Sequence, residues 1–250
     1  MVPKLYYEVD SKDLPIRIYD MYAVIGARDL GIEVCKYTDI KEDIVYNPYK
    51  IVVGNVVDLH WYLQDNNIPI PDDIDLTLFT SFMNRRFEKV QYQSLSRLNY
   101  PCFIKPTKAK AFDAGVFKSF DDLINFIPST YVHDFYYSSI KDYKSEWRVY
   151  VNNGKILKAC HYLGDPLLFP NSEIINNIVR YAETILTNHS YTVDVGVCQE
   201  VGGTQHTDLI ELNDGYAIGN YGLEPEQYYL FLRDRWLQIT GIRKKKDFKI

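Results

Sequence analysis

The sequence has none of the features of a membrane-embedded, secreted or disulfide-rich protein. Its apolar stretches are short, and none approaches the roughly 18–20 residues of a membrane-spanning helix. The N-terminal stretch MVPKLYYEVD carries acidic side chains and has no apolar core, unlike a signal peptide. The four cysteines are scattered and form no C-x-x-C pair, which argues against a zinc knuckle and a disulfide framework. We therefore expect reduced, mostly buried thiols in a cytoplasmic protein.

The short motifs of several large enzyme classes are also missing. The sequence contains no G-x-x-x-x-G-K-[ST], no G-x-G-x-x-G, no G-x-S-x-G and no H-E-x-x-H. Its five histidines do not show the spacing of metal ligands. These absences argue against a P-loop NTPase, a Rossmann dehydrogenase and a zinc hydrolase.

The charge balance disfavours nucleic acid as a partner. Lys and Arg number 28 against 33 Asp and Glu, which gives a net charge of −5, whereas nucleic-acid binders normally present a basic face. The one basic run, residues 243–246, is interpreted as a solvated tail. The length of 250 residues allows one large domain or two small ones.

The first part of the chain alternates between apolar runs and helical patterns. We expect helices at residues 20–30 and 56–64 and strands at residues 32–35 and 50–54, followed by a loop at residues 66–73. Such alternation is typical of a small α/β unit with a parallel sheet, to which we assign residues 1–78.

Hairpins dominate the rest of the chain, residues 79–250, for which we expect an α+β fold with antiparallel sheets. The pattern predicts a helix at residues 79–98, one that starts at Ser172, and one that starts at Pro225. An Asn-Gly pair at residues 153–154 predicts a tight hairpin turn. The remaining apolar runs predict strands at residues 102–105, 114–117, 131–135, 146–151, 155–161, 191–198 and 208–212.

A lysine at the end of an apolar strand is the first candidate functional residue. Lys105 follows Phe103 and Ile104, and Lys110 lies five residues later in a polar loop. Taken alone, Lys105 is best explained as a strand-end lysine that reaches solvent. A lysine-bearing strand with a mobile loop can also bind phosphates through ammonium charge and backbone N–H groups.

Acidic and basic side chains then recur on later strands. Glu146 and Arg148 share one strand face because strand side chains alternate, and an in-strand ion pair is an equally good explanation of them. Glu211 and Asn213 share a face in the same way, and Asp194 could approach them if their strands are antiparallel neighbours. Carboxylate and amide oxygens suit Mg²⁺ that bridges phosphates.

The ordered set Lys, Glu-x-Arg, Asp, Glu-x-Asn resembles the ATP-grasp superfamily of carboxylate–amine ligases. Phe103–Pro106, Glu146–Arg148 and Glu211–Gly215 are similar to a compact ATP-grasp group of bacteria and phages, named for two arginines and a lysine. The resemblance covers roughly residues 84–221. It implies an α/β N-terminal, pre-ATP-grasp-like subdomain followed by an α+β ATP-grasp fold with antiparallel sheets.

The resemblance also implies roles for particular residues. Lys105 would bind the α- and β-phosphates, Lys110 would lie in the loop over the triphosphate, and Arg148 would meet the γ-phosphate and the acyl-phosphate. Lys89 is similar to the superfamily's first nucleotide lysine, although it is closer to Lys105 than is usual. The other implied ATP contacts are Glu146 and a hinge at Val132, His133, Asp134 and Phe135, and the implied Mg²⁺ ligands are Asp194, Glu211 and Asn213.

The implied activity is an ATP-dependent and Mg²⁺-dependent ligase that forms an amide or peptide bond through an acyl-phosphate. Its partners would be small-molecule or peptide carboxylates and amines, with no membrane. An ATP-grasp phosphotransferase and a nucleotide-binding interaction protein without turnover remain alternatives. The identity of the substrates and the oligomeric state stay open, because one fold supports many substrates.

Overall fold

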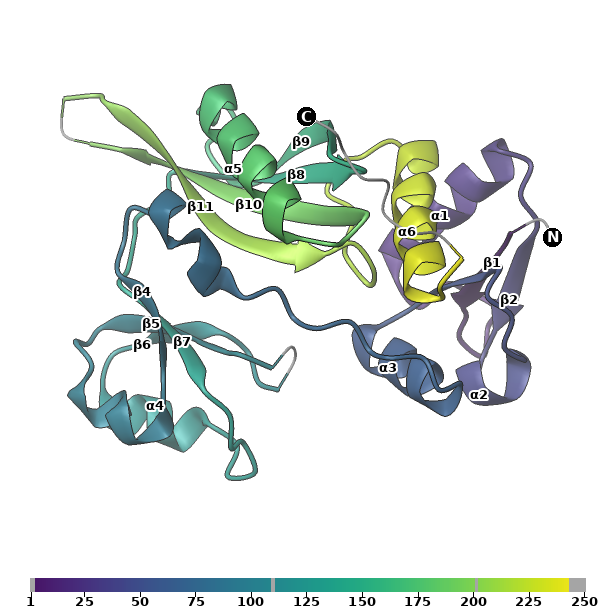
Figure 1. Ribbon diagram of the computed structural model, residues 1–250, viewed down its shortest axis with the longest axis horizontal. Coiled ribbons are helices and arrows are strands. Elements are labelled where there is room, and N and C mark those ends of the chain that lie inside the picture. Colours follow the sequence, from purple (N-terminus) through teal and green to yellow (C-terminus); the bar gives the residue numbers. More distant parts are fainter. Residues whose placement is uncertain (1–2, 109–110, 201, 243–250) are drawn as a thin grey trace.

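The structure is a computed structural model that describes residues 3–108, 111–200 and 202–242 (Figure 1). It contains a parallel sheet formed by the N-terminal part of the chain and two four-stranded antiparallel sheets. Within the described residues, no helix is both long and apolar enough to cross a membrane.

The N-terminal unit has a parallel sheet of strand order β2-β1-β3, as the alternating pattern predicts. Its strands are β1 (Lys4–Glu8), β2 (Val34–Tyr37) and β3 (Lys50–Val53), and its helices are α1 (Ile18–Asp29), α2 (Ile40–Asp43) and α3 (Val56–Asp65). The Asn55 side chain caps α3 by accepting a hydrogen bond from the backbone N–H of Asp58. The central strand β1 was not predicted, because two tyrosines and flanking charges hide its alternation.

The C-terminal helix α6 (Pro225–Ile239) returns to this N-terminal unit and packs beside α1 (Figure 1). Gly26 of α1 allows the close approach, since a Cβ atom there would collide with the carbonyl oxygen of Pro225. Trp236 of α6 stacks on Tyr62 of α3 in the shared core. The core of the N-terminal unit is therefore completed by a helix from the other end of the chain. The predicted boundary at residue 78 stays a prediction.

The larger antiparallel sheet has the strand order β11-β10-β8-β9. Its strands are β8 (Ser145–Asn152), β9 (Lys155–Gly164), β10 (Ser190–Gln199) and β11 (Gln205–Asp214). Helix α5 (Ser172–Ile185) packs on one face of the sheet, where the alternate side chains form an apolar core. The predicted Asn-Gly turn joins β8 to β9, with positive φ at both Asn153 and Gly154.

The smaller antiparallel sheet has the order β4-β7-β5-β6 and is covered by α4 (Phe120–Phe126). Its strands are β4 (Phe87–Val90), β5 (Cys102–Pro106), β6 (Gly115–Phe117) and β7 (Phe135–Ser138). The predicted helix at residues 79–98 is wrong: this segment forms the 3₁₀ helices η1 (Leu76–Phe82) and η2 (Tyr92–Arg97) with β4 between them. The short apolar runs there mimic a helical stripe, but sheet pairing of β4 with β7 outweighs local propensity.

The strand predicted at residues 131–135 is displaced toward the C-terminus. The structure begins β7 at Phe135, and all four of its residues are buried. Tyr131 instead ends a turn, where its hydroxyl donates a hydrogen bond to the carbonyl oxygen of Asp134. Aromatic residues favour strands by composition, and here the aromatic run extends across the turn into the strand.

Candidate functional site

A row of charged side chains crosses the larger sheet on the face opposite α5. Arg148 of β8 is paired in register with Asp194 of β10, and Asp194 is paired with Glu211 of β11. This register confirms that the strands of Asp194 and Glu211 are antiparallel neighbours. A bulge at Ile210 interrupts the ladder directly before Glu211, and such bulges re-aim the side chains beside them.

Arg148 and Asp194 form a buried, two-pronged ion pair. The Nε and Nη2 atoms of Arg148 donate to the two carboxylate oxygens of Asp194 at 2.8 and 2.7 Å. Their side chains are 7% and 3% exposed. The pair outcompetes the in-strand partner Glu146, whose carboxylate accepts a hydrogen bond from the Tyr162 hydroxyl at 2.7 Å. Bidentate geometry holds the guanidinium in one orientation.

Glu211 connects this row to the smaller sheet. Its carboxylate lies 2.5 Å from the Nζ atom of Lys105 on β5 and accepts a hydrogen bond from the Asn213 amide at 2.9 Å. The side chains of Lys105 and Glu211 are 28% and 27% exposed. Lys105, Arg148, Asp194, Glu211 and Asn213 are therefore assembled at one place, as their order in the sequence suggests.

The electrostatics of the two carboxylates differ. Burial raises the pKa of Asp194 to about 6, the charge of Glu211 acts in the same direction, and Arg148 opposes both. For Glu211, burial is the largest influence and favours the neutral acid, but Lys105, the Asn213 hydrogen bond and the charge of Arg148 together outweigh it, and the pKa is lowered. The site therefore concentrates negative charge that neighbouring cations compensate.

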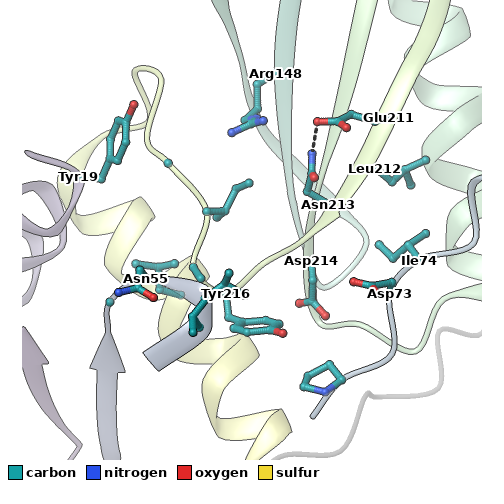
Figure 2. Close-up of a pocket in the computed structure, with 18 of the residues that line it drawn as sticks. Tyr19, Asn55, Asp73, Ile74, Arg148, Glu211, Leu212, Asn213, Asp214 and Tyr216 are labelled. Atoms are coloured by element: carbon teal, nitrogen blue, oxygen red, sulfur yellow. Dashed lines mark hydrogen bonds between the residues drawn. The ribbon is translucent and has the colours of Figure 1, made fainter. Parts of the chain in front are cut away.

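The charged row opens onto a cavity of about 690 Å³ that lies between the N-terminal unit and the two antiparallel sheets. Figure 2 shows Arg148, Glu211 and Asn213 on one side of it and Tyr19 and Asn55 of the N-terminal unit on another. Asp73 and Ile74 line it from the segment after α3. All three parts of the fold thus contribute to one cavity.

Aromatic rings border the cavity beside Arg148. The guanidinium lies 4.4 Å from the ring centroid of Tyr221, a distance suited to a cation–π contact. Tyr221 in turn contacts Tyr162, at 5.0 Å between centroids, and Tyr19, at 6.3 Å. The guanidinium is therefore held on one side by a carboxylate and on the other by an aromatic face.

Lys89 lies next to the site in the smaller sheet without lining the cavity. It is paired in register with Tyr136, which is paired with Lys105, so the three side chains form one row across β4, β7 and β5. The Nζ atom of Lys89 is 3.6 Å from Asp75 and its side chain is 39% exposed. Lys110 lies outside the described residues.

The predicted hinge at residues 132–135 does not lie at the connection between the antiparallel sheets. Val132, His133 and Asp134 precede β7 inside the smaller-sheet region, and none of them lines the cavity. The Asp134 carbonyl accepts hydrogen bonds from Thr107 and Tyr131. The chain passes from β7 of the smaller sheet to β8 of the larger sheet through residues 139–144. The connection between the sheets therefore lies after β7, whereas the predicted hinge lies before it.

Several cavity residues were not predicted from the sequence. Arg17 and Tyr19 precede or begin α1, Asn55 caps α3, and Tyr216 and Tyr221 follow β11. Isolated tyrosines in a chain with 22 of them give no signal in the sequence. Only their meeting at one cavity distinguishes them.

The chemistry of Asp194, Glu211 and Asn213 fits a divalent cation. The two carboxylates oppose each other across neighbouring strands, and the Asn213 amide oxygen takes no part in the hydrogen bond to Glu211. A cation would have to compete with Arg148 for Asp194 and with Lys105 for Glu211. Across the described residues, no group of three or more His, Cys, Asp or Glu side chains could hold a metal, so this set relies on an amide as its third ligand.

Comparison with known families identifies the class of protein to which these two antiparallel sheets and their Lys, Arg and carboxylate site belong, the ATP-grasp proteins. The profile that matches residues 82–231 is that of the ATP-grasp domain, family 2 of the clade named for two arginines and a lysine. The chain belongs to this family. The comparison with curated proteins found no significant sequence match to this chain.

Solved structures show the same fold at low sequence identity. D-alanine–D-alanine ligase from Bacillus anthracis, complexed with ATP, has a TM-score of 0.56 at 12% identity and covers 96% of this chain and 99% of that one. A RimK domain ATP-grasp protein from Sphaerobacter thermophilus has a TM-score of 0.55 at 9% identity, with 95% and 99% covered. The ATP-grasp ligase PsnB, complexed with a variant of its minimal precursor, Mg and ADP, has a TM-score of 0.52 at 14% identity, with 96% and 98% covered.

Proposed function

We propose that this protein is an ATP-dependent and Mg²⁺-dependent carboxylate–amine ligase that forms an amide or peptide bond. The observation that carries the proposal is the row Arg148–Asp194–Glu211, joined to Lys105 at the wall of the cavity. It is supported by the family of the chain and by structural neighbours that are ligases. The substrates are proposed only by class: a small-molecule or peptide carboxylate and an amine.

A carboxylate is a poor electrophile and must first be activated. In the proposed first step an oxygen of the substrate carboxylate attacks the γ-phosphorus of ATP, ADP leaves, and an acyl-phosphate forms. Charge on the transferring phosphoryl group has to be neutralised where it develops. Arg148, fixed by Asp194, would contact that group, and Lys105 would contact the α- and β-phosphates. Lys89 and Glu146 are proposed as outer nucleotide contacts and Lys110 as part of the covering loop.

Asp194, Glu211 and Asn213 are proposed to hold Mg²⁺, which would supply further neutralisation of the phosphate oxygens. In the second step the amine nitrogen attacks the acyl carbon, the carbon–oxygen bond to phosphate breaks, and the amine loses one proton. No side-chain nucleophile is required. This agrees with the absence of Ser-His and Cys-His motifs from the sequence.

An isotope experiment tests the proposal directly. Purified protein is incubated with Mg²⁺, ATP and a panel of ¹⁸O-labelled amino acids and peptides, and products are analysed by mass spectrometry. Ligation through an acyl-phosphate predicts ADP release that depends on both substrates, an amide product, and one ¹⁸O in the released phosphate. A phosphotransferase would give a stable phosphorylated product, and a binding protein would bind ATP without releasing ADP.

A further inference from the structure

The two segments that connect the smaller antiparallel sheet to the larger one are both tied to strand β11. The chain enters the smaller sheet through residues 83–86, the entry segment, and leaves it through residues 139–144, the exit segment. The two segments are hydrogen-bonded to each other, since the backbone N–H of Ser139 donates to the Arg86 carbonyl at 2.9 Å. They therefore form one narrow connection.

Arg85 is the centre of this connection. Its guanidinium donates four hydrogen bonds: to Ser138 Oγ at 2.8 Å, to Tyr143 Oη at 2.7 Å, and to the carbonyl oxygens of Leu209 and Ile210 at 2.6 and 3.0 Å. One side chain thus joins the end of β7, the exit segment and β11. Only arginine carries enough donors in a fixed fork for this pattern.

The position of these contacts on β11 matters for the site. Ile210 is the bulged residue directly before Glu211, and it has no partner in the register with β10. Arg85 supplies donors to this carbonyl and to that of Leu209. It therefore stabilises the bulge that directly precedes Glu211, the residue paired with Lys105 and in register with Asp194.

A second contact fixes the same region. Asp208, whose side chain is fully buried, accepts a hydrogen bond from the Asn84 amide at 2.6 Å and lies 3.5 Å from Lys141 Nζ. It links the entry and exit segments to β11 two residues before the bulge. The ring of Tyr143 also packs on β10, where a Cβ at Gly196 would collide with it.

We propose that Arg85 is a positioning residue that couples the orientation of the smaller sheet to the position of Glu211. It does not line the cavity, so it acts through the bulge and not by contact with a substrate. The proposal deepens the proposed function, because it rests on Glu211 being a Mg²⁺ ligand. It predicts two linked effects of losing Arg85: faster amide exchange in the connection between the sheets, and a higher Mg²⁺ concentration for half-maximal turnover.

The first test is hydrogen–deuterium exchange on the full chain without ligands. Arg85→Gln should exchange at least about tenfold faster in residues 139–144 and 207–211, the scale of one lost charged hydrogen bond. Arg86→Gln is the matched control, because the Arg86 side chain is exposed and pairs with Glu88 at 2.7 Å. Tyr143→Phe removes one hydroxyl and should produce a smaller increase in the same amides, even if Arg85→Gln does not fold.

The second test measures ATP turnover against Mg²⁺ concentration. Arg85→Gln should raise the Mg²⁺ concentration for half-maximal turnover about tenfold, with recovery at saturating Mg²⁺, and Arg85→Lys should be intermediate. The positioning role would be overturned if amide exchange in residues 139–144 and 207–211 were unchanged in folded Arg85→Gln and in Tyr143→Phe. It would also be overturned if exchange in helix α5 increased as much as in these two segments, because the effect would then be global. A wild type that neither binds nor turns over MgATP would overturn the proposed function instead, and the exchange data would still decide whether Arg85 holds the connection in place.

Discussion

The two antiparallel sheets present their charged side chains in different ways. The larger sheet buries its pair, Arg148 with Asp194, at 7% and 3% exposure in bidentate geometry. The smaller sheet presents Lys105 and Lys89 at 28% and 39% exposure, each facing one acidic partner. The larger sheet therefore holds a preorganised group, whereas the smaller sheet offers lysines that can exchange a protein partner for a ligand.

The difference follows from desolvation. Burial removes the hydration of both ions in a pair, and only well-aligned hydrogen bonds compensate for that loss. Separating the two ions inside the protein therefore costs several kcal/mol, about 3–5 kcal/mol when one partner is removed. A partly exposed lysine keeps water contacts and is weakly bound to its partner. We therefore expect MgATP to displace the contacts of the smaller sheet's lysines more readily than it displaces Arg148 from Asp194.

The largest expected effect is that of Arg148→Ala. It should lower turnover by about 10²-fold or more, as for loss of one contact to developing charge. Because it leaves Asp194 buried without its partner, it should also cost about 3–5 kcal/mol of stability. The near-complete burial of both side chains is the reason for this expected loss of stability.

Urea unfolding and ADP release measure the two effects separately. The double variant Arg148→Met/Asp194→Leu removes both charges and should recover much of the stability without recovering turnover. If Arg148→Ala were as stable as the wild type, the buried pair would contribute no more to stability than the exposed ion pairs of the smaller sheet.

Lys105→Ala should reduce turnover on a similar scale, about 10²-fold, but with a loss of stability below about 1 kcal/mol because the side chain is partly exposed. The matched control is Lys158→Ala, which breaks a 2.9 Å exposed pair with Glu224 away from the cavity. Steady-state kinetics and urea titration of both variants decide the assignment. Near wild-type turnover in Lys105→Ala would remove this lysine from the site.

Glu211→Gln sharpens the comparison by testing the residue that joins the sheets. ATP with Mg²⁺ at about 100 times its Kd should raise the wild-type Tm by about 5–10 °C, by mass action on the folded state. In Glu211→Gln most of the increment that depends on Mg²⁺ should disappear, since the charge is lost while the size is kept. Glu224→Gln serves as the control in the same thermal-shift titration. Equal shifts with Mg²⁺ and with a chelator in the wild type would exclude this metal site.

The smallest effect is expected for Lys89→Met, which keeps the aliphatic length beside Tyr136. Its exposed ion pair with Asp75 contributes little, so we expect a stability change below about 0.5 kcal/mol and a rise of KM for ATP of only a few fold. The KM rise should shrink at high salt, because salt screens exposed charges. A fall in kcat as large as that of Lys105→Ala would place Lys89 at the phosphates themselves.

The sequence by itself determined the strands that carry the site and the order of its residues. Alternation places Glu146 with Arg148, and Glu211 with Asn213, on single strand faces, and these periodic patterns are local properties that tertiary packing did not change. The turn at Asn153-Gly154 was also determined locally, because this hairpin turn needs positive φ at both central residues and Asn-Gly adopts it readily. The parallel N-terminal sheet also followed from local patterns, although β1 escaped detection.

Only the tertiary structure decided which of these residues are partners. The register across β8, β10 and β11 pairs Arg148 with Asp194 instead of Glu146. Glu211, directly after the bulge at Ile210, pairs with Lys105 on another sheet. The sequence did not reveal the exit segment or the role of Arg85, because the contacts of Arg85 join residues more than 50 positions apart. Patterns along a chain report periodicity, whereas pairing between distant segments depends on the free energy of the whole packed structure.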